Sequence, residues 1–396
     1  MALAALPVEL LDAVLAPLQP NLPALAATAL SCSALNPSAT RLLYRHLSLS
    51  AYARNLDVVR LLARRPHHAR LVRTFSVHLD DAGPAVLPTY SDLQRAIALM
   101  TNLTSLALYV DASASWILSP PLPDNGHKGD CLSPEPAFYP RLEHLTCNFP
   151  LDAHLAAFLG HVPSLISLQL SSLLSDADPQ SEPEQPLPVH VPPSHIPLLE
   201  AYTGPAYVLP TLASRPLRAL HLSGDLTLDL LPPAPSVPSA EEAMSRLRGP
   251  GAPAEHSSRA DPPSQEEAGA LLQVMSAITS AAPAQLLETL ALAYPNLVCL
   301  RLMTTRALWD LPDLAFYSRI ADTLSTLPRL VAFELSGMHW QSRPKATESE
   351  PAAIAEKEWI SPPVSPRAAE LPPPDDDDDD APRDYDFDGA FLDWSY

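Results

Sequence analysis

The stretch that decides the fold is Leu103-Thr104-Ser105-Leu106-Ala107-Leu108, an apolar segment of the form L-x-x-L-x-L. Clear copies of this form also begin at Leu165, Leu217, Leu297 and Leu330, and weaker ones at Val72, Leu142 and Leu199. Any buried strand can produce one copy. Eight copies in one chain indicate a repeating unit whose strands align their apolar faces.

Amphipathic helices are expected before several of these strands. Ser91 and Asp152 predict the caps of two of them, and a third is expected to carry Phe316, Ile320, Leu324 and Leu327. Because one helix and one strand cannot bury their own apolar faces, neighbouring units must stack. The pattern resembles an irregular leucine-rich-repeat solenoid, which implies an α/β fold over residues 51–341.

The first 47 residues predict three short helices. Leu6-Pro7 is typical of a helix start, and Leu10, Leu11 and Leu15 follow at helical spacing. Asn36-Pro37 predicts a capping residue followed by proline at the first helical position, in a third helix that reaches Leu47.

These helices resemble an F-box, in the form common in fungal F-box proteins, over residues 4–50. The resemblance rests on LPVELLDAVLAPL (6–18), LPALAATALSCSAL (22–35) and NPSATRLLYRHLSL (36–49). Many F-boxes carry a basic residue and a tryptophan after the central cysteine, whereas Cys32 is followed here by Ser33-Ala34-Leu35. An ordinary three-helix cap on a larger domain is the alternative interpretation.

Proline-rich segments interrupt the repeating pattern. The chain has 47 prolines and 11 glycines. We expect disordered inserts near 112–138, 174–195 and 231–265, and a disordered acidic tail over 342–396 that contains the run Asp375 to Asp380. The expected 231–265 insert is followed by an apolar stretch from Leu271 to Ile278, which we interpret as helical and as a candidate for a degenerate extra repeat.

Charge and cysteine usage narrow the class of protein. The net charge of −20 argues against nucleic-acid binding, although eight arginines and one acid lie between Arg41 and Arg73. That basic stretch is interpreted as a solvated helix face or as a contact for a polyanion. No apolar run is long enough for a membrane span, and the four separated cysteines favour a cytoplasmic or nuclear protein with reduced thiols.

No catalytic or metal-binding constellation is evident in the sequence. Phosphate-binding glycine loops and the G-x-S-x-G and H-E-x-x-H motifs are missing from it, so we expect no enzymatic activity and no cofactor. An enzyme of unrecognised type remains the alternative. The residues between the strand leucines are candidates for substrate binding: Tyr109, His144, Asn148, Gln169, His221, Arg301, Met303 and Glu334.

Together the two resemblances imply a non-catalytic substrate receptor of an SCF-type ubiquitin ligase. In that family, the F-box docks on a Skp-type adaptor, which is joined to a cullin scaffold, and the repeats hold a protein substrate. The resemblance assigns the adaptor contacts to Leu6, Pro7, Leu10, Leu11 and Leu15. The alternative function is a repeat scaffold that never meets a ligase.

Overall fold

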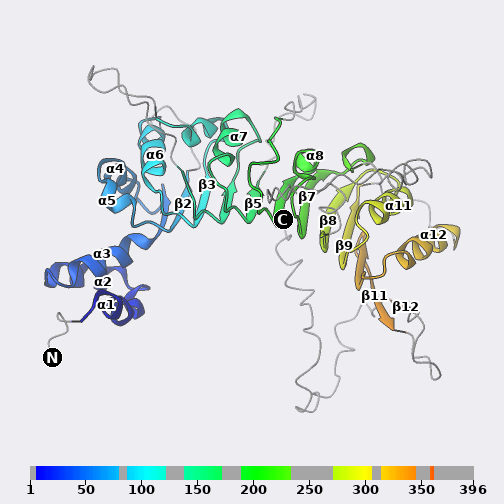
Figure 1. The fold of residues 1–396 in the computed structure, drawn as a ribbon, viewed down its shortest axis with the longest axis horizontal. Coiled ribbons are helices and arrows are strands. Elements are labelled where there is room, and N and C mark those ends of the chain that lie inside the picture. The colour runs from blue at the N-terminus through cyan, green and yellow to red at the C-terminus, as the bar shows by residue number, and fades with distance from the viewer. Residues whose placement is uncertain are drawn as a thin grey trace, which may run out of the picture.

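Three short helices lie at one end of the molecule, beside a long sheet covered by helices (Figure 1). The computed structural model describes residues 6–79, 87–121, 138–171, 189–232, 271–305, 314–344 and 357–360. The three helices are α1 (Val8–Leu15), α2 (Leu22–Ser31) and α3 (Asn36–Arg45), with the short 3₁₀ turn η2 (Ala16–Leu18) after α1. We call residues 8–45 the three-helix unit.

The sheet contains twelve described strands, which lie side by side in the order of the chain. They are β1 (His46–Ser50), β2 (Thr74–His78), β3 (Ser105–Tyr109), β4 (His144–Cys147), β5 (Ser167–Leu170), β6 (Ala201–Pro205), β7 (Ala219–Asp225), β8 (Val274–Thr279), β9 (Cys299–Thr304), β10 (Ala332–Leu335), β11 (Met338–Pro344) and β12 (Lys357–Ile360). The first ten are parallel, and β11 and β12 pair antiparallel at the end. The protein is therefore mixed α/β with a mostly parallel, open sheet.

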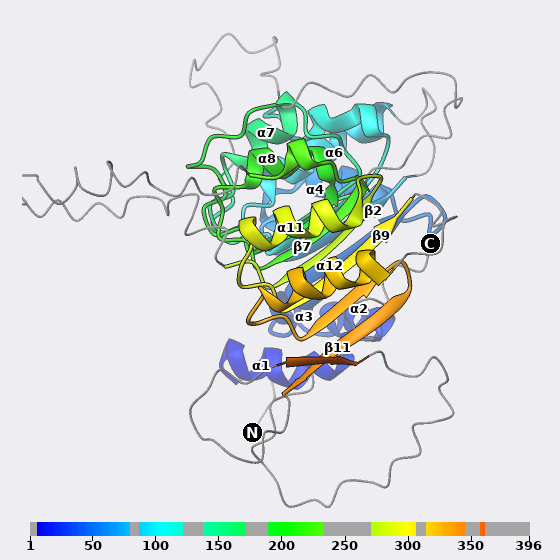
Figure 2. The same cartoon turned by 90° about the vertical axis from the view of Figure 1, so that its right-hand side faces the viewer.

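The connections between the parallel strands lie on one face of the sheet. They contain α4 (Asp57–Arg64), α5 (Pro66–Ala69), α6 (Leu87–Leu99), η4 (Ala112–Leu118), α7 (Ala153–Leu159), η5 (Ala206–Val208), α8 (Leu209–Leu212), η6 (Leu228–Leu230), α11 (Pro283–Ala293) and α12 (Leu314–Ser325). Crossovers of one hand between strands in sequential order bring every connection to the same side. Figure 2 shows the larger of these helices beside the strands.

Every L-x-x-L-x-L motif named in the sequence precedes a strand. The first residue of each motif is at most 6% exposed, and the strand begins two residues later, as with Leu103 and β3. The side chains at the fourth and sixth positions of the motifs point toward the helices and join one hydrophobic core that runs from Leu49 to Leu335, except in β6, where the sixth position is Gly204. We call the sheet, its helices and this core the sheet body.

Three local predictions were wrong. The stretch around 271–278 forms strand β8 rather than a helix, because its apolar side chains fill the place of the strand leucines beside β7 and β9. The third N-terminal helix ends at Arg45, and Leu47 belongs to β1. Ser91 lies inside α6, which begins at Leu87.

The capping predictions had mixed outcomes. Asp152 caps α7 as expected, since its carboxylate accepts a hydrogen bond from the Leu155 N–H at 2.9 Å. Asn36 is not the cap of α3: the cap position is Leu35, and the Asn36 side chain donates to the Ala29 carbonyl at 2.9 Å.

Parts of the segments expected to be disordered are ordered. Residues 112–118 form η4, in which Ile117 and Leu118 are buried in the core. Val191 is also buried, and Arg215 donates to its carbonyl at 3.1 Å. Residues 122–137, 172–188 and 233–270, which contain the remainder of the predicted inserts, lie outside the described residues.

The first residues of the predicted disordered tail belong to the sheet. Residues 338–344 form β11, in which Trp340 stacks on Phe333 of β10 with ring centroids 5.3 Å apart. β12 pairs with β11 at residues 357–360. The rest of the tail, including Asp375 to Asp380, lies outside the described residues.

Candidate binding surface

One row of side chains crosses the face of the sheet opposite the helices. Cross-strand pairing places its members at the same level of all ten parallel strands. This central row consists of Ser48, Ser76, Ala107, Thr146, Gln169, Thr203, His221, Ser276, Arg301 and Glu334. The residues on either side of each member point into the core, since strand side chains alternate between faces. The face is therefore polar almost from end to end.

At one end of the central row, the buried carboxylate of Glu334 lies close to two basic side chains. Arg301 Nε lies 3.1 Å from Glu334 Oε2, and His339 Nδ1 of β11 lies 3.6 Å from the same oxygen. The Glu334 side chain is only 3% exposed, and that of Arg301 is 19% exposed. Such a pair presents an oriented guanidinium edge rather than two free charges.

His221 lies in the middle of the central row. Burial lowers the pKa of His221, so its ring is neutral at neutral pH. Its Nδ1 atom is buried and has no hydrogen-bond partner in the described part of the chain.

The opposite end of this face carries aromatic and hydroxyl groups. His78 and Tyr109 stack with ring centroids 4.5 Å apart, and His78 Nε2 lies 3.2 Å from the hydroxyl of Ser76. His46 Nδ1 lies 3.1 Å from the hydroxyl of Thr74. Burial and the neighbouring Arg45 charge lower the pKa of His46, and burial raises that of Tyr109. This end offers neutral hydrogen-bonding groups.

Four of the predicted substrate-binding residues share the central row: Gln169, His221, Arg301 and Glu334. The structure does not bring the others into it. His144 is exposed one row away, beside Ser105 and Ser167, and Met303 is exposed on β9 beside Ile278. Tyr109 lies in a further row with His78.

Two of the predicted residues are too buried to contact a partner directly. Asn148 is 6% exposed, and its side chain binds both the N–H and the carbonyl of Val110, so it joins the ends of two neighbouring segments. Glu334, the second of them, is 3% exposed and would influence a partner by orienting Arg301. Sequence reasoning missed His78, although the alternation Thr74-Phe75-Ser76-Val77-His78 places it on this face.

The first helix carries apolar residues on two sides. Leu11 and Leu15 are each 4% exposed and face inward, so they are not accessible anchors. Leu10 and Val14 are 51% and 48% exposed and lie one turn apart, with Pro7 exposed one turn earlier. We call Pro7, Leu10 and Val14 the outer stripe of α1. Val14 was absent from the predicted contacts, although its i+4 spacing from Leu10 could have identified it.

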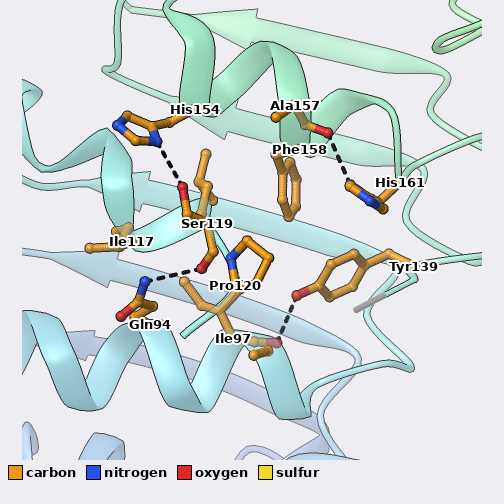
Figure 3. Close-up of a pocket in the computed structure, with 12 residues that line it drawn as sticks. Gln94, Ile97, Ile117, Ser119, Pro120, Tyr139, His154, Ala157, Phe158 and His161 are labelled. Atoms are coloured by element: carbon orange, nitrogen blue, oxygen red, sulfur yellow. Dashed lines mark hydrogen bonds between the residues drawn. The ribbon is translucent and has the colours of Figure 1, made fainter. Parts of the chain in front are cut away.

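Figure 3 shows a small cavity of about 30 Å³ among the helices. Its polar groups are bonded to each other or to backbone: Tyr139 donates to the Ile97 carbonyl at 3.0 Å, and His154 Nδ1 lies 2.8 Å from the Ser119 hydroxyl. His161 Nδ1 lies 2.9 Å from the Ala157 carbonyl. These groups tie η4, α6 and α7 together and account for the cavity as packing.

Within the described ranges, no cluster of three or more histidine, cysteine, aspartate or glutamate side chains is arranged to hold a metal ion. No described helix has the length and apolar character needed to cross a membrane. The chain matches no protein-family model, and a search of curated proteins finds no significant match.

Proposed function

We propose that the chain is a non-catalytic substrate-recognition subunit of an SCF-type ubiquitin ligase. The three-helix unit would act as an F-box that binds a Skp-type adaptor, which is joined to a cullin scaffold. The sheet body would act as an irregular leucine-rich-repeat domain that holds a protein substrate. Ubiquitin transfer would then be accelerated by proximity, without side-chain chemistry from this chain.

The outer stripe of α1 carries the proposal. Leu11 and Leu15 already fill the inward side of α1, yet Leu10 and Val14 stay about half exposed on the other side. Leu22 of α2 is also 54% exposed. Neighbouring apolar side chains on the outside of a small helical unit favour a protein partner that covers them. Leu6, Pro7, Leu10 and Val14 are therefore the accessible contacts in this proposal.

The central row supports the substrate-binding part of the proposal. It presents hydroxyl, amide, imidazole and guanidinium groups in order across ten strands. Rigid strands fix the spacing of these groups, so little side-chain entropy is lost when a protein surface docks. Arg301, oriented by Glu334, is the member best suited to a dominant contact, because arginine is enriched among interface hot spots.

Co-purification with a recombinant Skp-type adaptor tests the proposal. We expect the wild-type chain to capture the adaptor, and Leu6→Asp combined with Leu10→Asp to abolish capture by placing two charges in an apolar contact. Leu292→Asp is the matched control, because Leu292 is 61% exposed on α11 in the sheet body. Circular dichroism of each variant checks that the fold is retained.

Two results would contradict the ligase role: no capture by the wild-type chain, or equal capture by the double variant and the control. The alternative is a scaffold that works without a ligase, in which the three-helix unit only caps the sheet body. That alternative predicts partner binding sensitive to Arg301→Ala and insensitive to the α1 double variant.

A further inference from the structure

A hollow of about 470 Å³ opens where the three-helix unit meets the first strands of the sheet. Four arginines line it, from the last turns of α3 and from the segment that connects α5 to β2. The complete lining is Asp12, Arg41, Leu42, Arg45, His46, Arg70, Leu71, Arg73, Asn102 and Thr104. Its volume lies in the range of small-molecule sites.

Backbone hydrogen bonds hold these arginines at one edge of the sheet. Arg45 and Arg73 immediately precede β1 and β2, and the Arg73 N–H donates to the Arg45 carbonyl at 2.9 Å. The Asn102 amide donates to the Arg70 carbonyl at 2.9 Å, and Arg73 Nη1 donates to the Asn102 carbonyl at 3.2 Å. Arg45 ends α3 and Arg70 and Arg73 lie between α5 and β2, so these hydrogen bonds fix the arginines beside the first residues of two neighbouring strands.

The charges around the hollow are unbalanced. Asp12 is the single acidic residue that lines the hollow, and its carboxylate forms an ion pair with Arg41 at 2.7 Å. Arg45, Arg70 and Arg73 form no ion pair with a carboxylate of the described residues. Burial lowers the pKa of Arg73, and the nearby positive charges of Arg141 and Arg45 lower it further.

We propose that this hollow binds a small anion that carries two or more phosphate groups. Guanidinium groups bind phosphate oxygens in two-pronged pairs, and several phosphates present enough acceptors for Arg45, Arg70 and Arg73 together. A single carboxylate would leave most of the excess positive charge uncompensated. The site is independent of the adaptor and substrate surfaces proposed above.

The net charge of the chain favours a small ligand over a nucleic acid. At −20, the whole molecule repels a long polyanion that extends beyond the hollow. Charges separated by more than about 8 Å are largely screened at physiological ionic strength, so a ligand enclosed by the arginines interacts mainly with them.

Titration calorimetry of the full chain with sodium tripolyphosphate at fixed ionic strength tests the proposal. We expect saturable one-to-one binding that is tighter than binding of citrate. Arg45→Gln, Arg70→Gln and Arg73→Gln should each weaken it about tenfold or more, since each removes charge-assisted hydrogen bonds. Arg45 and Arg70 are exposed, so their variants should fold.

The matched control is Arg64→Gln. Arg64 is an exposed arginine in the last turn of α4, within the same basic stretch of sequence but outside the lining of the hollow. Its substitution should leave the affinity unchanged. The proposal is overturned if no saturable binding occurs, if citrate binds as tightly, or if Arg64→Gln weakens binding as much as Arg45→Gln. Tighter binding of a short single-stranded RNA, with the same arginine dependence, would also overturn it.

Discussion

The three-helix unit and the sheet body bury their apolar residues on very different scales. The three-helix unit is built around a cluster of four buried side chains, namely Leu15, Leu25, Ala39 and Leu42. The sheet body contains one continuous core that extends through all of the parallel strands. Each new helix and strand of the body packs on the previous one, whereas the three helices pack mainly on each other and reach the sheet body through α3, whose Tyr44 packs against the core of the body.

The difference explains where the exposed apolar residues gather. Within residues 8–45, Val8, Leu10, Val14, Leu22 and Leu30 are all more than 40% exposed, whereas the much longer described part of the sheet body has seven large apolar residues above that exposure. A small unit cannot enclose every apolar side chain of three amphipathic helices. We therefore expect it to be the less stable of the two regions and the one better suited to a partner that completes its core.

The cysteines give the largest expected contrast between the two regions. Burial raises the pKa of Cys147 in β4 to about 12. At pH 8 roughly one molecule in ten thousand then carries its thiolate, which is the reactive form. Unfolding returns the pKa to about 8.5, so alkylation of Cys147 by iodoacetamide should accelerate by about a thousandfold.

Cys32, at the end of α2, is half-buried and should be alkylated in the native protein. Mass spectrometry of peptides taken at successive times, with and without urea, measures both rates. Native alkylation of Cys147 as fast as that of Cys32 would show that the sheet body opens as readily as the three-helix unit.

Two leucine truncations compare the cores directly. Leu106 in β3 and Leu25 in α2 are both fully buried. Each substitution to alanine should cost about 2–5 kcal/mol locally. Leu106→Ala should lower the free energy of unfolding of the sheet body, measured in urea. Leu25→Ala should instead abolish hydrogen-exchange protection over residues 8–45 while amides of β3 and β4 stay protected. Equal loss of protection in β3 would show that the regions unfold as one.

The smallest expected difference between the sheet body and the three-helix unit concerns one ion pair in each region. Glu334→Gln should destabilise the protein by about 3 kcal/mol, because it leaves Arg301 without its buried counter-charge. Asp12→Asn breaks the pair with Arg41, whose side chains are 38% and 32% exposed, and should cost about 0.2–1 kcal/mol. Urea unfolding at low and high salt measures both. The destabilisation by Asp12→Asn should decrease at high salt. If Asp12→Asn destabilised the protein more than Glu334→Gln does, that result would contradict the difference in burial between the two ion pairs.

The strands were predictable because their signal is local. Alternation of apolar and polar residues repeats every two positions, so Leu106 and Leu108 identify β3 without knowledge of its neighbours. β8 was missed because Met275 and Ala277 stand where other strands have leucine. Only its place between β7 and β9 makes it a strand.

The candidate site was predictable only in part, because side-chain alternation is a local signal. Alternation correctly placed Gln169, His221 and Arg301 on the face opposite the helices. It also selected Asn148, which follows β4 and turns inward to bond Val110. Burial at the end of a strand depends on the neighbouring segment, and the pattern of one strand contains no information about it.

By itself, the sequence determined eight of the ten parallel strands and much of the polar face, since both follow from side-chain alternation within a few residues. The basic stretch from Arg41 to Arg73 is evident in the sequence, but only the tertiary structure decided that Arg45, Arg70 and Arg73 surround one hollow and that Leu10 and Val14 stay exposed outside the core. Arg45 precedes Arg70 and Arg73 by about 25 residues, and it lies beside Arg73 because the Arg73 N–H bonds the Arg45 carbonyl where β1 and β2 begin. Proximity of that kind is a property of the assembled sheet, and no local pattern specifies it.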